Sequence, residues 1–226
     1  MEYIESDIFS SDSSLKHGFI YLEEPADIKG LLKQTKLGMI KTVNQVHGDE
    51  FVYFNEPDEF EKNYDADAIV TGVRGFGVGV YTADCVPVIF FDEDKSIWGV
   101  IHAGWRGTLA RITEKVSQYL ISKKGCNINT LKFAIGPCIE SCCYEIGEEI
   151  AVQFQNAFND CNLYLRKNNG SKYSLDLRAA NIEQLKSNGI KFIDNVNICT
   201  MCDKDYPSYR RDGKNAGRML SFIGLV

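Results

Sequence analysis

Histidine is scarce in this sequence: His17, His47 and His102 are the three imidazoles among 226 residues. That scarcity limits which metal centres the chain can build from imidazole ligands. Basic residues are also in deficit, since the net charge is −6 and the pI is near 5.2. Such a balance argues against a surface built for nucleic acid or an anionic membrane, although it leaves room for a local basic pocket.

Long apolar runs are absent, so the sequence predicts no membrane span. The first residues, "MEYIESDIFSSDSS", lack the basic start and apolar core of a signal peptide, and we expect a cytoplasmic protein. The signatures G-x-S-x-G, H-E-x-x-H, Walker A and H-x-E with P-C-x-x-C are missing as well. The glycines of 71–80, "TGVRGFGVGV", do not fit a dinucleotide fingerprint, because a strand rather than a helix follows them.

Cysteine, in contrast, is frequent, with eight residues in the chain. In a chain of this length without an export signal, thiols, metal ligands or catalytic groups are more common than disulfides.

Repeats and linkers are lacking, so we interpret 1–226 as a single domain. The predicted strands are 17–22, 39–46, 51–54, 66–71, 77–91, 97–102, 131–136, 162–166, 172–177 and 191–198, and the predicted helices are 27–37, 108–122, 147–158 and 178–187. The turn "DEDKS" predicts an antiparallel hairpin of 77–91 with 97–102. The fold class is therefore mixed α/β, richer in strand than in helix, and not a purely parallel doubly wound sheet.

Three apolar segments end in polar clusters that contain His47, Cys85 and His102. Two imidazoles and a thiolate form a good ligand set for Zn²⁺, and three protein ligands are the pattern of a catalytic rather than a structural site. A metal there would ionise the thiol and lower the pKa of a bound water. Each of the three also fits the simpler interpretation of a hydrogen-bonded core residue.

Two arginine motifs suggest anion binding. In "AGWRGT", Arg106 precedes a helix predicted to begin at Thr108, and a helix start together with a guanidinium suits phosphate. In "SYRRDG", Arg210 and Arg211 precede a turn near the C-terminus. Ordinary surface or salt-bridged arginines are the alternative for both motifs.

A C-x-x-C pair, Cys199 and Cys202, accompanies Cys138, Cys142 and Cys143 of "GPCIESCC". A structural four-thiolate zinc site is one hypothesis for these cysteines, and packed, reduced thiols are the other.

Taken together, six ordered motifs resemble one family over nearly the whole chain, from about residue 17 onward: "NQVHG", "DADAIVT", "YTADCVPVIFFD", "GVIHAGWRGT", "IGPCIESCCYEIGEE" and "CTMCDKDYPSYRRDGKNAGR". This is the laccase-domain or polyphenol-oxidoreductase family, also called purine nucleoside phosphorylase-like. The resemblance implies mixed sheets sandwiched between helices in α/β/β/α layers, as in cysteine-hydrolase-like domains. It also implies a zinc ion held by His47, Cys85 and His102.

The resemblance further implies phosphorolysis of adenosine, inosine, guanosine and methylthioadenosine, together with deamination of adenosine; some members are linked to peptidoglycan precursors. On that basis the expected small-molecule partners are purine nucleosides and phosphate. We assign Asn44, Gln45, Arg106, Thr108 and Arg211 to substrate or phosphate binding. Asp84 or Glu145 would move protons at the metal, although Asp84 also fits a turn cap that accepts backbone N–H groups.

Three other functions stay open at this point. Cys85 and His102 form a nucleophile and base for a metal-free hydrolase acting on a peptidoglycan precursor. A copper-dependent phenol oxidoreductase is a second alternative, because copper competes well for zinc ligands; three histidines are nevertheless too few for several coppers. A non-catalytic metabolite-binding protein is the third.

Overall fold

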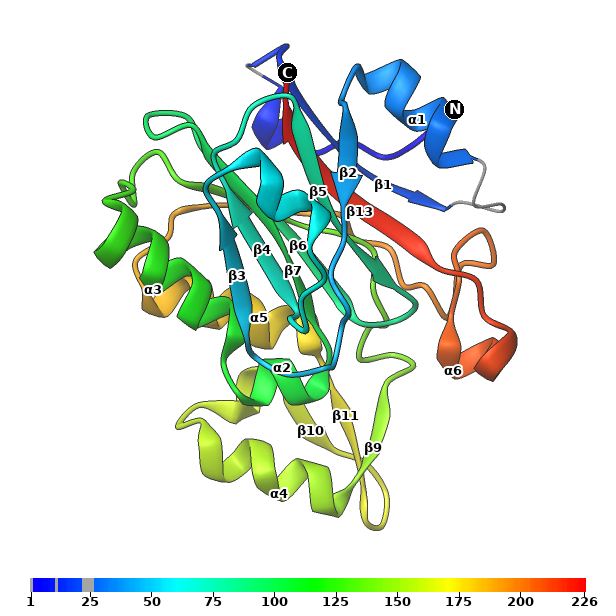
Figure 1. Cartoon of the computed structure of the whole chain (residues 1–226). Coiled ribbons are helices and arrows are strands. Elements are labelled where there is room, and N and C mark those ends of the chain that lie inside the picture. The colour runs from blue at the N-terminus through cyan, green and yellow to red at the C-terminus, as the bar shows by residue number, and fades with distance from the viewer. Residues whose placement is uncertain (1, 11, 22–26) are drawn as a thin grey trace.

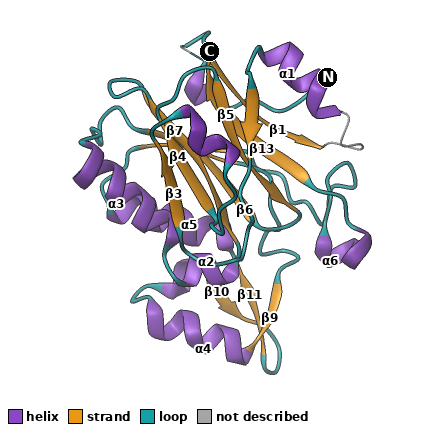
Figure 2. Cartoon of the chain, viewed as in Figure 1, coloured by secondary structure: helices purple, strands orange, loops and turns teal. Residues whose placement is uncertain are grey.

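The computed structural model describes residues 2–10, 12–21 and 27–226. Two mixed sheets pack face to face at its centre (Figures 1 and 2). The smaller sheet has the order β1 (Leu15–Tyr21), β13 (Met219–Leu225), β5 (Phe76–Thr82) and β2 (Met39–Lys41). The larger sheet has the order β12 (Phe192–Asn195), β8 (Lys132–Ile135), β6 (Val86–Asp92), β7 (Ile97–Ala103), β4 (Ala68–Thr71) and β3 (Phe51–Phe54).

Helices cover the outer faces of both sheets. Helix α1 (Asp27–Thr35) packs through Leu31 on the four-stranded sheet. Helices α2 (Trp105–Leu109), α3 (Ile112–Lys124) and α5 (Leu177–Ser187) lie on the six-stranded sheet, on the side away from α1 in Figure 1. The predicted α/β/β/α layering is confirmed.

A small third sheet extends from this sandwich. Its order is β10 (Leu165–Lys167), β11 (Lys172–Leu175) and β9 (Glu145–Gly147), and α4 (Glu148–Ala157) lies beside it (Figure 1). The remaining elements are the short helix α6 (Tyr209–Asp212) and the 3₁₀ turns η1 (Asp7–Phe9), η2 (Pro57–Glu61), η3 (Cys161–Leu163) and η4 (Gly213–Asn215). Among the described residues, no helix combines the length and the apolar character needed to cross a bilayer.

The core between the two large sheets explains their apolar sequences. Trp98 and Val100 of β7 point into it from one side, and Val80 of β5 and Ile223 of β13 from the other, all with no exposed surface. Strands β6 and β7 are buried on both faces, because helices cover the opposite side of their sheet. Such strands read as continuous apolar runs without alternation.

The predicted strand 77–91 is wrong in one respect that matters for the site. It is two strands, β5 and β6, and they belong to different sheets. Residues 83–85 form the turn by which the chain crosses from one sheet to the other, with Asp84 at a φ of 88°. The predicted hairpin is confirmed for β6 and β7, which pair antiparallel from Val86↔Ala103 to Asp92↔Ile97.

The predicted helix 108–122 is also wrong at its start. The helix begins at Trp105, breaks at Arg111 (φ 65°) and resumes as α3, so Thr108 lies inside α2 rather than at its N-cap. Gly125 ends α3 in the left-handed conformation (φ 67°), which glycine adopts more readily than other residues.

Other boundaries differ as well. Strand 39–46 ends at Lys41, strand 162–166 begins with the η3 turn, and residue 22 of the predicted strand 17–22 lies outside the described residues. Strand β13 was not predicted, although it lies between β1 and β5 in the smaller sheet.

Candidate metal centre and pocket

His47, Cys85 and His102 converge, although each comes from a different part of the fold. His47 lies in the loop after β2, Cys85 in the turn between the two sheets, and His102 near the end of β7. Their ligand atoms all lie within 4.8 Å of one another. The two imidazoles meet edge to face, with ring centroids 4.8 Å apart. The three predicted ligands therefore form one cluster.

Asp67, a residue that was not predicted from the sequence, holds this cluster in place. Its side chain is fully buried, and its Oδ1 lies 2.7 Å from Nδ1 of His102. The same carboxylate accepts the backbone N–H groups of His47 (3.0 Å) and Gly48 (2.6 Å). Because Nδ1 of His102 faces Asp67, Nε2 is the nitrogen left for a metal, as in carboxylate–histidine–metal arrangements. The signal in the sequence was an acid directly before the apolar strand β4.

Gly104 leaves the space that the ligands occupy. A Cβ atom at this position would lie 3.1 Å from Sγ of Cys85 and 3.4 Å from Cδ2 of His47. A side chain there would press on two of the three ligands, so a glycine at the end of β7 is needed for close approach.

The electrostatics of the cluster favour a thiolate. Burial opposes ionisation of Cys85, but hydrogen bonds and charge from His102 and His47 outweigh it and lower the pKa of the thiol to about 6. Burial likewise opposes the charged form of His102, whereas the hydrogen bonds that this form donates to Asp67 and Cys85 raise its pKa to about 9. A charged His102 beside an ionised Cys85 is a thiolate–imidazolium pair, in which a divalent cation would take the place of the imidazolium proton.

These donors fit a single metal ion better than several coppers. Two imidazoles and one thiolate are a complete set of three ligands for a catalytic zinc site. The third histidine, His17, is buried in β1, where its Nε2 lies 3.0 Å from the backbone nitrogen of Ser6. A multinuclear copper centre needs more imidazoles than the two that remain.

The cluster lies in a pocket of about 690 Å³, a size suited to a small-molecule ligand. Aromatic and basic side chains dominate its lining. The lining residues are Gln45, His47, Tyr81, Thr82, Ala83, Asp84, Cys85, His102, Trp105, Arg106, Tyr144, Tyr209, Arg210 and Arg218.

Asp84 lines this pocket, but both of its carboxylate oxygens already have partners. Thr200 donates its hydroxyl to Oδ1 (2.7 Å), and the backbone N–H of Arg210 donates to Oδ2 (2.6 Å). Its backbone carbonyl accepts the N–H of Ile139 (2.9 Å). These bonds tie the inter-sheet turn to the segment that carries Arg210, which favours the turn-cap interpretation.

Glu145 and Thr108 lie outside the pocket. The carboxylate of Glu145 is half exposed on β9 and lies 3.8 Å from Nζ of Lys172. Thr108 is fully buried, and its hydroxyl accepts a hydrogen bond from Asn181 of α5 (2.9 Å). The Thr108 hydroxyl is therefore enclosed between α2 and α5, and this geometry gives no support to its predicted role in phosphate binding.

Of the other predicted binding residues, Arg106 and Gln45 line the pocket and Asn44 does not. Arg106 lines the pocket and its guanidinium lies 4.3 Å from the ring centre of Trp105. Gln45 lines it too, while its amide makes two 2.8 Å hydrogen bonds with the backbone of Tyr81. Asn44 is exposed and donates to Asp65 instead.

Arg211 points away from the pocket. Its guanidinium donates to the backbone carbonyls of Thr200 (2.9 Å) and Tyr206 (2.7 Å) and pairs with Asp212. Arg210, the adjacent residue, faces the pocket. Of the two adjacent arginines, Arg210 rather than Arg211 therefore belongs to the lining of the pocket.

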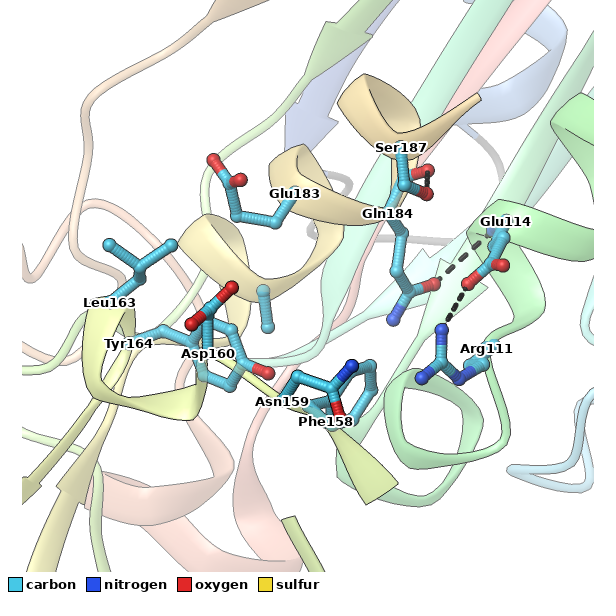
Figure 3. A pocket seen from close by; sticks show the side chains of 11 residues that line it. Arg111, Glu114, Phe158, Asn159, Asp160, Leu163, Tyr164, Glu183, Gln184 and Ser187 are labelled. Carbon is cyan, nitrogen blue, oxygen red and sulfur yellow. Dashed lines mark hydrogen bonds and ion pairs between the residues drawn. The ribbon is translucent and has the colours of Figure 1, made fainter. Parts of the chain in front are cut away.

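A second pocket, of about 220 Å³, lies by α3, α5 and the end of α4 (Figure 3). Three of its charged lining residues are in ion pairs: Arg111 pairs with Glu114 (2.7 Å), and Glu183 pairs with Lys186 (2.8 Å). It contains none of the predicted site residues, so the larger pocket is the candidate active site.

Known proteins resemble this chain over most of its length. A family model described as multi-copper polyphenol oxidoreductase laccase matches residues 26–226. A protein named purine nucleoside phosphorylase from Clostridium acetobutylicum is 36% identical over 185 residues, which cover 80% of this chain and 75% of that protein. A protein named adenosine deaminase RL5, from an unknown prokaryotic organism, is 37% identical over 163 residues, which cover 70% of this chain and 61% of that protein. The crystal structure of the hypothetical protein YfiH from Bacillus licheniformis superposes with a TM-score of 0.87 at 26% identity, covering 94% of this chain and 93% of that one.

Proposed function

The chain belongs to the multi-copper polyphenol oxidoreductase laccase family, and from this premise we propose that it is a zinc-dependent purine nucleoside phosphorylase that also deaminates adenosine. The proposed substrates are adenosine, inosine, guanosine and methylthioadenosine, with phosphate as co-substrate. The observation that carries the proposal is the convergence of His47, Cys85 and His102 in a pocket lined by aromatic rings and arginines. The eight free thiols fit a reducing compartment, and we retain the cytoplasm as the proposed location.

Each residue of the cluster, and Asp67 beside it, has a distinct proposed role. His47, Cys85 and His102 would hold the zinc ion, which supplies Lewis-acid chemistry when bound. Asp67 keeps Nδ1 of His102 occupied and fixes the backbone of the loop that carries His47. Correct orientation of the ligands therefore depends on a residue that does not touch the metal.

Phosphate and purine have separate partners in the pocket. Arg106, Arg210 and Arg218 supply guanidinium groups suited to phosphate oxygens. Trp105 and Tyr144 offer the purine base the ring faces that Arg106 and Arg210 do not cover. Burial raises the pKa of Tyr144 to about 12, so its hydroxyl remains a neutral hydrogen-bond donor at physiological pH.

In phosphorolysis, the bond between the ribose C1′ and the purine nitrogen breaks, and a bond forms between C1′ and a phosphate oxygen. Positive charge develops on the sugar, and the proton of hydrogen phosphate ends on the leaving purine. The arginines hold the anionic nucleophile beside that charge, which is catalysis by positioning and electrostatics. Deamination instead consumes water and releases ammonia from the purine. Asp84 would serve both reactions indirectly, because it accepts the backbone N–H of Arg210 and so fixes the side of the pocket that carries Arg210.

Product analysis tests this proposal. Inosine with phosphate should yield hypoxanthine and ribose 1-phosphate, whereas adenosine without phosphate should yield inosine and ammonia. His47→Ala should abolish both reactions, and Lys191→Ala, a change of an exposed residue outside the pocket, should abolish neither. Absence of both product sets with zinc-loaded protein would refute the assignment.

A cysteine hydrolase is the second candidate, because the structure contains a nucleophile–base–acid series. Cys85 and His102 lie within contact range, and His102 is oriented by Asp67 at 2.7 Å, an arrangement that also activates thiol nucleophiles. A peptidoglycan-precursor amide is the proposed substrate class for this alternative. Activity that survives chelation and passes through a trapped Cys85 adduct would favour the hydrolase; activity lost to chelation and restored by zinc favours the phosphorylase.

A further inference from the structure

Besides the cluster of His47, Cys85 and His102, the structure contains a cluster of four thiols outside the pocket lining. Cys142 and Cys143 come from the loop between β8 and β9, and Cys199 and Cys202 from the segment between β12 and α6, which can be followed in Figure 1. Their sulfur atoms all lie within 4.8 Å of one another. No residue of this cluster lines the candidate active site.

The spacing of these sulfurs matches one tetrahedral ion. With Zn–S bonds of about 2.3 Å, the edge of the sulfur tetrahedron is about 3.8 Å. Sγ of Cys142 lies 3.6 Å from Cys143, 3.7 Å from Cys199 and 3.8 Å from Cys202, and the Cys143–Cys202 distance is 3.3 Å. All four distances exceed the S–S bond of about 2.05 Å, so these are free thiols. Sulfurs this close enclose one ion and leave no room for a core of several irons.

The backbone holds the two thiol-bearing segments together. The backbones of Cys138 and Cys199 pair in an isolated parallel β-bridge. In this bridge the N–H of Cys138 donates to the carbonyl of Ile198 (3.2 Å), and the carbonyl of Cys138 accepts from the N–H of Thr200 (3.1 Å). In the C-x-x-C turn, the N–H groups of Cys202 and Asp203 both donate to the carbonyl of Cys199. The positions of the sulfurs therefore do not depend on flexible side chains alone.

Arg178 of α5 contacts both of these segments and holds them together. Its guanidinium pairs with Glu140 (2.6 Å) in the first segment and donates to Asn197 (3.2 Å) and to the carbonyl of Ile198 (3.1 Å) in the second. Arg178 is itself almost fully buried. The frame around the thiols is thus preformed, as metal sites with high affinity require.

We propose that Cys142, Cys143, Cys199 and Cys202 bind one structural Zn²⁺ ion, separate from the ion of the active site. Four protein sulfurs close the coordination sphere, which is the pattern of a structural rather than a catalytic zinc. The ion joins the segment that carries Tyr144 to the segment that carries Arg210. It thereby fixes one wall of the pocket, where Nη1 of Arg210 also donates to the carbonyl of Glu145 (3.1 Å).

Metal analysis of the His47→Ala variant tests the site without the active-site ion. Purified without added metal, this variant should retain one zinc per chain, and its zinc X-ray absorption should show only sulfur neighbours at about 2.3 Å. Adding Cys199→Ser and Cys202→Ser should remove that zinc. Adding Cys161→Ala, a change of a buried thiol outside both clusters, should leave it in place.

Three results would overturn the proposal. The first is a folded His47→Ala protein that binds no zinc after dialysis against a zinc solution. The second is nitrogen or oxygen neighbours of the zinc in place of sulfur, and the third is an intact mass that shows disulfides among the four cysteines. If His47→Ala does not fold, the zinc content and the zinc X-ray absorption of the wild-type protein test the same proposal. Two zinc ions per chain with five sulfurs and two imidazoles between them support the site, and one zinc ion with a single sulfur contradicts it.

Discussion

Asp67 is the residue on which the geometry of the candidate metal ligands depends. It is fully buried, and it contacts His102 through the imidazole and His47 through the backbone. Hydrogen bonds from Gly48, His47 and His102 keep the carboxylate ionised, so its pKa is lowered although burial acts in the opposite direction. One negative charge thus orients two ligands that are 55 residues apart in sequence.

Asp67→Asn should therefore weaken metal binding at the active site. An amide cannot carry the negative charge that holds Nδ1–H of His102, and loss of such a partner typically lowers metal affinity about 10–100-fold. Competition against a chromophoric chelator measures this affinity. Asp65→Asn is the matched control, because Asp65 is exposed and bonds Asn44. Equal affinities for the two variants would contradict the positioning role of Asp67.

Arg106→Ala should weaken the use of phosphate more than the use of nucleoside. A charge-assisted hydrogen bond to an anion contributes about 1.5–3 kcal/mol, which corresponds to about a 10–100-fold rise in the KM for phosphate. Steady-state phosphorolysis at varied phosphate measures this KM. Arg166→Ala removes the same charge from β10, outside the pocket, and should leave it unchanged. A rise confined to the KM of the nucleoside would show that Arg106 contacts the purine or ribose instead.

At the scale of elements, the segment from Cys199 to Asp212 forms a wall that other residues hold in place. Asp84 accepts the N–H of Arg210, and Arg211 binds the carbonyls of Thr200 and Tyr206. Neither side chain needs to touch substrate to affect the pocket. The two arginines therefore have different tasks, one toward the pocket and one toward the backbone behind it.

Arg211→Ala should loosen this wall without removing a substrate contact. The loss of charged hydrogen bonds to two carbonyls should lower the local free energy of opening by about 1–3 kcal/mol. Hydrogen exchange measured by mass spectrometry should then accelerate in 199–211, and the KM for both substrates should rise. In Arg166→Ala protein, exchange in that segment should match the wild type. Unchanged exchange after Arg211→Ala would show that the wall is held by other contacts.

Strand β13 is the element that joins the smaller sheet. It pairs with β1 on one side and with β5 on the other, and Phe222 packs with Ile40 beneath α1. Because β5 leads directly into the turn that carries Cys85, the position of a ligand depends on a strand at the other end of the chain.

Phe222→Ala should destabilise the fold by about 3–5 kcal/mol, the usual cost of removing a fully buried aromatic ring. Denaturant unfolding measures this change in the free energy of unfolding. Tyr209→Ala, a change of an exposed ring, should cost far less. A small effect of Phe222→Ala would mean that β13 is not part of the cooperative core.

At the scale of the whole molecule, the family resemblance implied the layers, and the polar clusters at strand ends pointed to His47, Cys85 and His102, which converge in the structure. The point at which the chain crosses from one sheet to the other was not predicted. An apolar run looks the same whether it continues in one sheet or crosses to another, so 77–91 was predicted as one strand. Asp84, at a φ of 88°, marks the crossing. Two adjacent arginines, Arg210 and Arg211, carry no signal for which one faces a pocket, because that depends on the orientation of a four-residue helix.

The overall charge also contrasts with the pocket. The chain carries a net charge of −6, yet three arginines line the candidate active site. Three guanidinium groups in one cleft focus positive potential there, which suits an anionic ligand.

Anomalous diffraction at the zinc absorption edge, from crystals of protein loaded with zinc, tests the central claim most directly. We predict a peak in contact with Nε2 of His102, the imidazole of His47 and the sulfur of Cys85. A zinc-loaded crystal with no peak among these three side chains, or with the side chains turned away from one another, would contradict the account.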